Sequence, residues 1–236
     1  MAHEFTVNEQ NGCTYLQLPH LKKVKHAFCT RQGEEGTLAA LEISAERLLT
    51  LRQVHGTEVL IFDDNTNKAL TLPQPYDAVI THKKRVALGI STADCLPILM
   101  IDKSKKVIAA IHAGWRGIWR RVIERTVAEM QKVFKSSPPD ILVGIGPGIG
   151  PCCYEVKEDV VSLFQNSHDT AHRFIQVREG RTYLDLNHAA RLELTKAGIP
   201  PENIEAIPLC TACRADLFFS FRRDKKPGRQ MNLIML

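Results

Sequence analysis

Short apolar runs bounded by charged or glycine-rich turns occupy the middle of the chain and predict a β-sheet. The runs at residues 86–90, 96–101 and 107–111 are short, aliphatic and partly β-branched, which favours buried strands over helices. A charged turn at residues 102–106 separates the second run from the third. A turn of this length is typical of an antiparallel hairpin, so we expect these two strands to pair.

Residues 119–134 change to the spacing of a helix. Apolar side chains recur there every three or four positions, and charged side chains such as Arg120 and Glu124 fall off that face. Pro138 and Pro139 predict the end of this helix. Further predicted elements are a strand at 141–145, helices at about 157–164 and 187–197, a hairpin at 173–186 and a strand at 218–224. Helices mixed with hairpins indicate an α/β (α+β) fold, a layered mixed-sheet sandwich.

The composition is that of an ordinary globular protein of 236 residues, long enough for a single well-buried domain over residues 1–236. The net charge is +5, but the basic residues are scattered rather than gathered in a stripe with aromatic side chains. We therefore expect no nucleic-acid partner, and small anionic ligands such as phosphate instead.

The cysteines and the N-terminal segment indicate a compartment. There are seven cysteines, an odd number, and the N-terminal segment lacks the apolar core of a signal peptide, which favours free thiols in a reducing cytoplasm. No apolar run approaches the roughly 20 residues needed to cross a bilayer. We expect a cytoplasmic protein without a membrane partner, and nothing in the pattern indicates an oligomeric state.

Two histidines and one cysteine form the strongest candidate for a functional site: His55, Cys95 and His112, each in a neighbourhood of small residues. Two imidazoles and a thiolate suit zinc and leave the fourth tetrahedral position open for water or substrate. Ligands that come singly from three distant segments are typical of a catalytic site. Each residue also has a plain structural interpretation, as a hydrogen-bonded turn histidine or a small buried thiol. Spacing alone favours the metal-site interpretation and the structural interpretation equally.

Asp94, Arg116 and Arg223 are the candidate partners of this site. Asp94 directly precedes Cys95 and could serve as a general acid or base, or could orient a ligand histidine. Arg116 stands in a glycine turn before the helix, where free N–H groups favour anions. We expect Arg116 and Arg223 to hold phosphate; the alternatives are a surface ion pair for Arg116 and a solvated strand end for Arg223.

Two other motifs are weaker. Residues 144–151 are rich in glycine and proline but lack the third glycine of the dinucleotide fingerprint, so we interpret them as a rigid loop that approaches another segment closely. Cys210 and Cys213 have C-x-x-C spacing, but a zinc ribbon needs a second such pair, and Cys152-Cys153 is too tight for one. We interpret these cysteines as ordinary thiols, with a redox dithiol as the alternative.

Several segments in the same order resemble the YfiH family, long labelled polyphenol oxidase or multicopper laccase and now described as purine nucleoside phosphorylase-like. They are residues 53–56, 92–97, 112–117, 146–150 with 153–156, and 219–224. The resemblance runs from about residue 26 to the C-terminus. It implies a sandwich fold related to cytotoxic necrotizing factor, a cysteine hydrolase, and it makes His55, Cys95 and His112 the zinc ligands.

The resemblance also implies an activity: phosphorolysis of adenosine, inosine and methylthioadenosine, with adenosine deamination as a second reaction. The partners would be a purine nucleoside and phosphate, and the cofactor would be zinc with copper as the other candidate metal. Our own working hypothesis makes Asp94, Cys95 and His112 the catalytic residues. One alternative is a cysteine hydrolase in which His112 activates Cys95, including the peptidoglycan-precursor editing attached to some members.

Two further alternatives are a copper-dependent polyphenol oxidase and a nucleoside-binding module with structural zinc. The chain has 9 histidines and no His-x-His pair, which argues against a trinuclear copper cluster within one chain.

Overall fold

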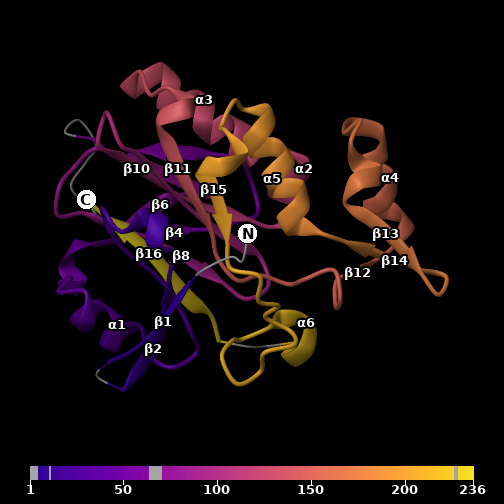
Figure 1. The fold of residues 1–236 in the computed structure, drawn as a ribbon, viewed down its shortest axis with the longest axis horizontal. Helices are drawn as coiled ribbons and strands as arrows, with labels where there is room; N and C mark the ends of the chain where they lie inside the picture. The colour runs from indigo at the N-terminus through magenta and orange to yellow at the C-terminus, as the bar shows by residue number, and fades with distance from the viewer. Residues whose placement is uncertain (1–4, 11, 64–70, 226–227) are drawn as a thin grey trace.

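Two β-sheets packed face to face form the centre of the computed structural model, which describes residues 5–10, 12–63, 71–225 and 228–236 (Figure 1). The first sheet has seven strands, in the order β1 (Thr6–Gln10), β2 (Cys13–Gln17), β3 (Lys25–Cys29), β16 (Gln230–Met235), β8 (Ala87–Thr92), β4 (Leu48–Arg52) and β6 (Thr71–Pro75). The second sheet has six, in the order β15 (Ile204–Ala206), β11 (Ile141–Ile145), β9 (Leu96–Asp102), β10 (Val107–Ala113), β7 (Ala78–Thr81) and β5 (Val59–Ile61).

The predicted hairpin is confirmed by the antiparallel pairing of β9 with β10. Its register places Ala113 opposite Leu96 and His112 opposite Pro97. The start of β9 therefore lies beside the end of β10, in the middle of the second sheet.

Side chains on the buried strands alternate between two cores, as the period of two in a strand requires. On β9, Leu99 and Ile101 enter the core between the sheets, which also contains Phe28 of β3. Ile98 and Met100 of the same strand enter the core beneath the helices. Every residue of β9 and β10 is buried, so both faces of this hairpin are covered.

Helices cover the outer face of each sheet. α2 (Trp115–Trp119), α3 (Val122–Phe134) and α5 (Leu186–Lys196) pack on the six-stranded sheet, and α1 (Glu34–Ala40) packs on the seven-stranded one (Figure 1). This order of layers confirms the predicted layered mixed-sheet sandwich. To one side lie α4 (Glu158–Ser167) and the small sheet of β12 (Glu155–Val156), β14 (Arg181–Leu184) and β13 (Ile175–Arg178). The single domain over residues 1–236 stays a prediction.

The predicted helix at 119–134 is interrupted. Arg121 adopts a left-handed backbone with φ of 64°, and its N–H donates to the carbonyl of Ile118, so α2 ends before α3 begins. Apolar periodicity continues across this break, which is why the sequence shows one helix where the structure has two.

The predicted strand at 218–224 is wrong. Ser220 Oγ accepts a hydrogen bond from the Arg223 N–H and caps the short helix α6 (Phe221–Asp224). Phe218 is fully buried, whereas Phe221 is 62% exposed, so the run of aromatic residues does not share one buried face. The last strand is β16, which lies inside the seven-stranded sheet.

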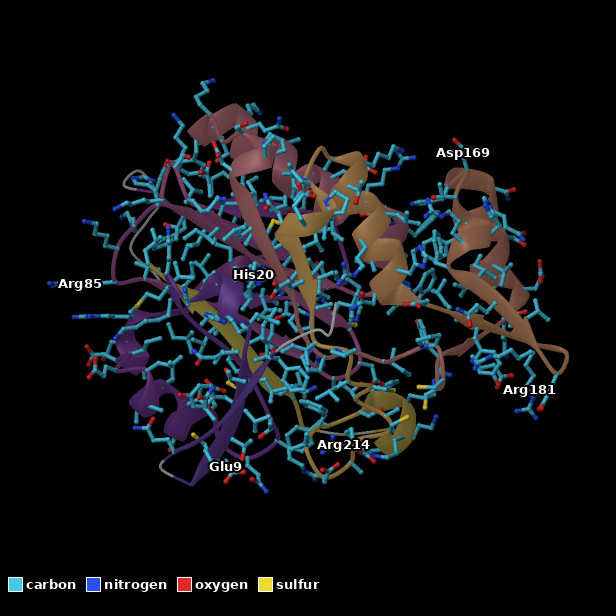
Figure 2. The ribbon with its side chains drawn as sticks, viewed as in Figure 1. Glu9, His20, Arg85, Asp169, Arg181 and Arg214 are labelled. Atoms are coloured by element: carbon cyan, nitrogen blue, oxygen red, sulfur yellow. The ribbon has the colours of Figure 1, made fainter. Side chains whose placement is uncertain are left out.

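Charged side chains such as Arg85, Asp169 and Arg181 extend from the periphery of the molecule (Figure 2). Within the described ranges, no helix has both the length and the apolar character that crossing a membrane requires.

Candidate metal centre and its cavity

The structure brings His55, Cys95 and His112 together at the ends of two central strands of the six-stranded sheet. Cys95 directly precedes β9 and His112 is near the end of β10, opposite Pro97, so the hairpin register places the two residues close to each other. His55 lies in the loop between β4 and β5, in a left-handed conformation with φ of 59°. One ligand atom from each of the three lies within 4.8 Å of the others.

Gly114 makes this convergence sterically feasible. A Cβ at this position would lie 2.9 Å from Cys95 Sγ, which is closer than such contacts occur, and 3.0 Å from His55 Cδ2, which is tighter than most of them. Any larger residue would therefore push the thiol and the imidazole apart. The imidazoles of His55 and His112 meet edge to face, with ring centroids 4.8 Å apart.

Asp77, which the sequence analysis did not single out, organises both histidines. Its Oδ1 accepts hydrogen bonds from His112 Nδ1 at 2.7 Å and from the His55 N–H at 2.9 Å. Its Oδ2 accepts from the N–H groups of Gly56 at 2.6 Å and Val54 at 3.2 Å. The carboxylate is fully buried. It fixes the Nδ1–H tautomer of His112 and leaves Nε2 for the site.

Burial opposes the charged forms of Cys95 and His112, yet each group stabilises the charge of the other. Despite burial, the imidazoles of His112 and His55 lower the pKa of the Cys95 thiol to about 6. Despite burial, the Cys95 thiolate and the Asp77 carboxylate raise the pKa of His112 to about 9. Without a metal, the pair is therefore a thiolate beside an imidazolium near neutral pH.

These residues fit a zinc-type metal. Two imidazoles and a thiolate of lowered pKa are a donor set that zinc accepts, with a fourth position left for another ligand. The hydrogen bond from His112 to Asp77 is the support that a metal-ligating histidine usually has. Binding would replace the proton on His112 and release it.

A cavity of about 600 Å³ opens directly beside the three residues. Its lining combines aromatic, cationic and small residues: His55, Ala93, Asp94, Cys95, Trp115, Arg116, Ile149, Tyr154, Leu186, Phe221, Arg222, Lys225, Gly228 and Arg229. The Arg116 guanidinium lies 4.5 Å from the centre of the Trp115 ring, and that of Arg222 lies 5.1 Å from the centre of the Tyr154 ring. This volume and polarity suit a small, partly aromatic and anionic ligand set.

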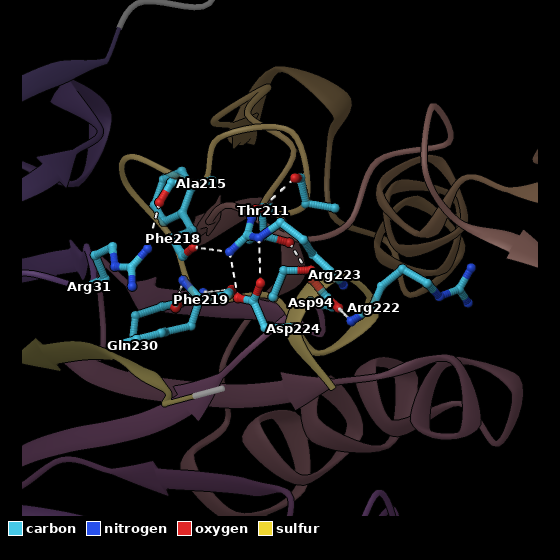
Figure 3. A network of polar contacts seen from close by, with 12 residues as sticks. Arg31, Asp94, Thr211, Ala215, Phe218, Phe219, Arg222, Arg223, Asp224 and Gln230 are labelled. Atoms are coloured by element: carbon cyan, nitrogen blue, oxygen red, sulfur yellow. Dashed lines mark hydrogen bonds and ion pairs between the residues drawn. The ribbon is translucent and has the colours of Figure 1, made fainter. Parts of the chain in front are cut away.

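Arg116 lines the cavity as expected, but Arg223 is not in its lining. The Arg223 guanidinium donates to the carbonyls of Thr211, Ala212 and Phe218 and to the Asp224 carboxylate (Figure 3). Its donors are used in holding the C-terminal loop together.

Asp94 lines the cavity but touches neither histidine through a described hydrogen bond. Its Oδ1 accepts from Thr211 Oγ1 at 2.6 Å, and its Oδ2 accepts from the Arg222 N–H at 2.7 Å (Figure 3). The role of orienting a ligand histidine therefore falls to Asp77 rather than to Asp94. Asp94 joins the Cys95 segment to the wall of the cavity that carries Arg222.

The glycine-rich loop is confirmed as a segment of close approach. A Cβ on Gly146 would lie 2.1 Å from Phe28 Cδ1, and one on Gly148 would lie 2.5 Å from Leu96 Cδ2. The Ile149 N–H donates to the carbonyl of Asp94, which ties this loop to the cavity.

A mixed α/β fold of two packed sheets carries a His–Cys–His donor set beside a cavity. These features define the class of the protein as an α/β protein with a candidate metal centre. Residues 29–236 match the family model described as multi-copper polyphenol oxidoreductase laccase, and the chain belongs to this family of enzymes. The fold is that of the Bacillus licheniformis hypothetical protein YfiH, with a TM-score of 0.86 and 26% identity over 98% of each chain. The resemblance to the YfiH family is confirmed.

Named relatives are similar over much of the chain. A protein of Bacteroides thetaiotaomicron named purine nucleoside phosphorylase is 37% identical over 256 aligned residues, covering 94% of this chain and 95% of that protein. A protein from an unknown prokaryotic organism named adenosine deaminase RL5 is 32% identical over 192 residues, covering 78% of this chain and 72% of that protein.

Proposed function

We propose that this enzyme is a zinc-dependent purine nucleoside phosphorylase acting on adenosine, inosine and methylthioadenosine, with adenosine deamination as a second reaction. The observation that carries the proposal is the cavity, which joins a metal donor set to aromatic and cationic side chains. The names of the two relatives support the same two reactions.

The cavity lining provides the groups that phosphorolysis needs. Trp115, Tyr154 and Phe221 offer aromatic faces for a purine. Arg116 offers a guanidinium group for phosphate. Arg222 lines the cavity, as Arg223 does not, and the donors of its guanidinium other than Nη1, which bonds the carbonyls of Cys153 and Glu155, offer a second group in place of Arg223. A phosphate oxygen bonds to the anomeric carbon while the glycosidic C–N bond breaks. The electron pair of the C–N bond leaves with the base, which then takes up a proton.

His55, Cys95 and His112 would hold the zinc ion, with copper as the other candidate metal. When bound, zinc supplies a Lewis acid that polarises a substrate oxygen or activates water for deamination. Asp77 keeps the His112 imidazole turned toward the metal position. We assign proton transfer to Asp94, because its carboxylate lines the cavity.

The test is release of adenine from adenosine as a function of inorganic phosphate, with enzyme of measured zinc content. We expect release to require phosphate and to be lost in His112→Ala. His188→Ala is the matched control, because His188 lies on α5 and is absent from the cavity lining. We expect the His188→Ala enzyme to release adenine at the normal rate. Ammonia without adenine would restrict the activity to deamination, and no turnover with zinc bound would exclude both reactions.

A second candidate function follows from the thiolate–imidazolium pair. Cys95 beside His112 has the charge state of a cysteine nucleophile with its base. Iodoacetamide separates the two candidates, because a thiolate that coordinates zinc is protected. Inactivation of fully zinc-loaded enzyme, together with a label on Cys95, would favour the hydrolase.

A further inference from the structure

Four cysteines from two distant segments form a second sulfur cluster. Cys152 and Cys153 follow the glycine-rich loop after β11, and Cys210 and Cys213 lie in the turn after β15. A backbone bridge between Gly148 and Cys210 joins the two segments. The Sγ atom of Cys213 lies 3.4 Å from that of Cys153 and 3.5 Å from that of Cys152, and all four Sγ atoms lie within 4.8 Å of one another.

These separations match the size of a tetrahedral zinc site. Four sulfur atoms bound to zinc at about 2.3 Å lie about 3.8 Å from one another, which is within the observed spread. All four cysteines are free thiols. Thiols are weak donors and weak acceptors, so four of them in contact stabilise one another little. A shared cation is the partner that satisfies all four.

The backbone around Cys210 is arranged for a thiolate. Its Sγ accepts a hydrogen bond from the N–H of Gly150 at 3.2 Å. An N–H group that donates to sulfur stabilises the thiolate form that a metal ligand needs. A Cβ on Gly150 would lie 3.2 Å from Cys152 Sγ, so glycine allows this approach.

Two guanidinium groups stand behind the cluster. Arg223 Nη1 donates to the carbonyls of Thr211 and Ala212, in the turn that carries Cys210 and Cys213, at 2.9 Å and 3.1 Å. Arg222 Nη1 donates to the carbonyl of Cys153, in the other cysteine-bearing segment, at 3.3 Å. Zinc with four thiolates carries a net charge of about −2, and guanidinium groups bonded to the two turns that hold the thiolates partly offset this charge.

We propose that Cys152, Cys153, Cys210 and Cys213 bind a structural zinc ion. The ion fastens the turn after β15 to the glycine-rich loop and so fixes the adjoining segment with Arg222 in the wall of the cavity. Four thiolates complete a closed tetrahedron, so this zinc takes no part in chemistry. The site is independent of the metal at His55, Cys95 and His112 and of the activity proposed above.

The test measures metal at the four-cysteine site alone, in a His55→Ala/His112→Ala variant that lacks the other donor set. We expect this variant, purified without chelators, to retain about one zinc ion per chain by mass spectrometry of the metal. Replacement by Co²⁺ should give the visible absorption bands of a tetrathiolate site. Adding Cys210→Ser and Cys213→Ser should abolish both signals.

A matched control is Cys13→Ser in the same background, because Cys13 is a buried thiol of β2 outside both clusters. It should keep the zinc and the Co²⁺ bands. The proposal would be overturned by a folded His55→Ala/His112→Ala variant that has no zinc and no Co²⁺ bands and in which the four clustered cysteines titrate as free thiols. A Cys210–Cys213 disulfide in place of metal would overturn it in favour of a redox dithiol.

Discussion

The two sulfur clusters of this molecule have little in common apart from cysteine. Cys95 is one donor among two imidazoles, is positioned by strand ends, and has the buried carboxylate of Asp77 behind its histidine partners. The cluster around Cys210 contains only thiols, is positioned by two turns, and has guanidinium groups behind it.

The difference concerns what each arrangement can do. Three mixed donors would leave one coordination position of a bound metal open, and these donors lie beside a cavity of about 600 Å³. Four thiolates leave none open. A carboxylate behind a histidine increases the basicity of that ligand, whereas cations behind thiolates balance excess negative charge. The first arrangement is suited to chemistry and the second to holding two loops together.

Removing one sulfur from each cluster should give the largest contrast. We expect Cys95→Ala to lower kcat/KM for adenosine phosphorolysis about 10³-fold or more, because losing a catalytic metal costs several kcal/mol of transition-state stabilisation. Cys213→Ala should lower it by less than about 10-fold and should act mainly through stability. Steady-state kinetics and thermal unfolding of both variants provide the measurement. Equal losses of kcat/KM would contradict the division of roles.

Asp77→Asn should weaken the metal site without removing a ligand. An amide cannot replace a carboxylate that accepts four hydrogen bonds, so we expect zinc affinity to fall about 10- to 100-fold in competition with a chelator. Asp102→Asn is the matched control, because Asp102 is equally buried and accepts two backbone N–H groups at the far end of β9. It should change stability but not zinc affinity. An unchanged affinity in Asp77→Asn would exclude the support role.

Two arginines should separate phosphate binding from loop stability. Arg116→Ala should raise the KM for phosphate about 10-fold, which corresponds to about 1.4 kcal/mol for one charged contact. Arg223→Ala should instead lower the free energy of unfolding by about 1–3 kcal/mol, because it leaves the carbonyls of Thr211, Ala212 and Phe218 without their donor. Phosphate kinetics and urea unfolding test both. A normal phosphate KM in Arg116→Ala would reject that residue as a phosphate ligand.

The sequence predicts the parts of the site that local pattern encodes. Short apolar runs separated by a charged turn predict the β9–β10 hairpin, and its register pairs His112 with Pro97, two residues from Cys95, which brings Cys95 close to His112. The glycine at position 114 stands where the backbone must allow the thiol and the imidazole of His55 to meet. Local chemistry and chain geometry agree at these positions, so sequence reasoning succeeds there.

Long-range partners are what the sequence does not reveal. Asp77 is a single acid before an apolar run at 78–80, and only the folded chain shows that three N–H groups and an imidazole donate to it. The adjacent pair Cys152-Cys153 lacks knuckle spacing, yet folding brings it to Cys210 and Cys213. In the sequence, the signals of these two features are an acid without an adjacent basic residue before an apolar run and an isolated C-x-x-C. Each signal becomes a site only through a partner that is distant in sequence.

The pH dependence of alkylation distinguishes the clusters with the smallest perturbation, since no residue is changed. In metal-free protein, the alkylation rate of Cys95 should rise through pH of about 6 and then level off, because its lowered pKa makes the thiolate dominant above that value. Burial and the Cys213 thiol raise the pKa of Cys153 to about 11, so its rate should still be rising at pH 9. Rates for each cysteine can be followed by mass spectrometry of iodoacetamide adducts. His112→Gln should move the Cys95 midpoint upward, because burial then opposes the thiolate without the imidazolium. Coinciding midpoints for Cys95 and Cys153 would contradict the thiolate–imidazolium pair and, with it, the electrostatic basis for placing the chemistry at Cys95.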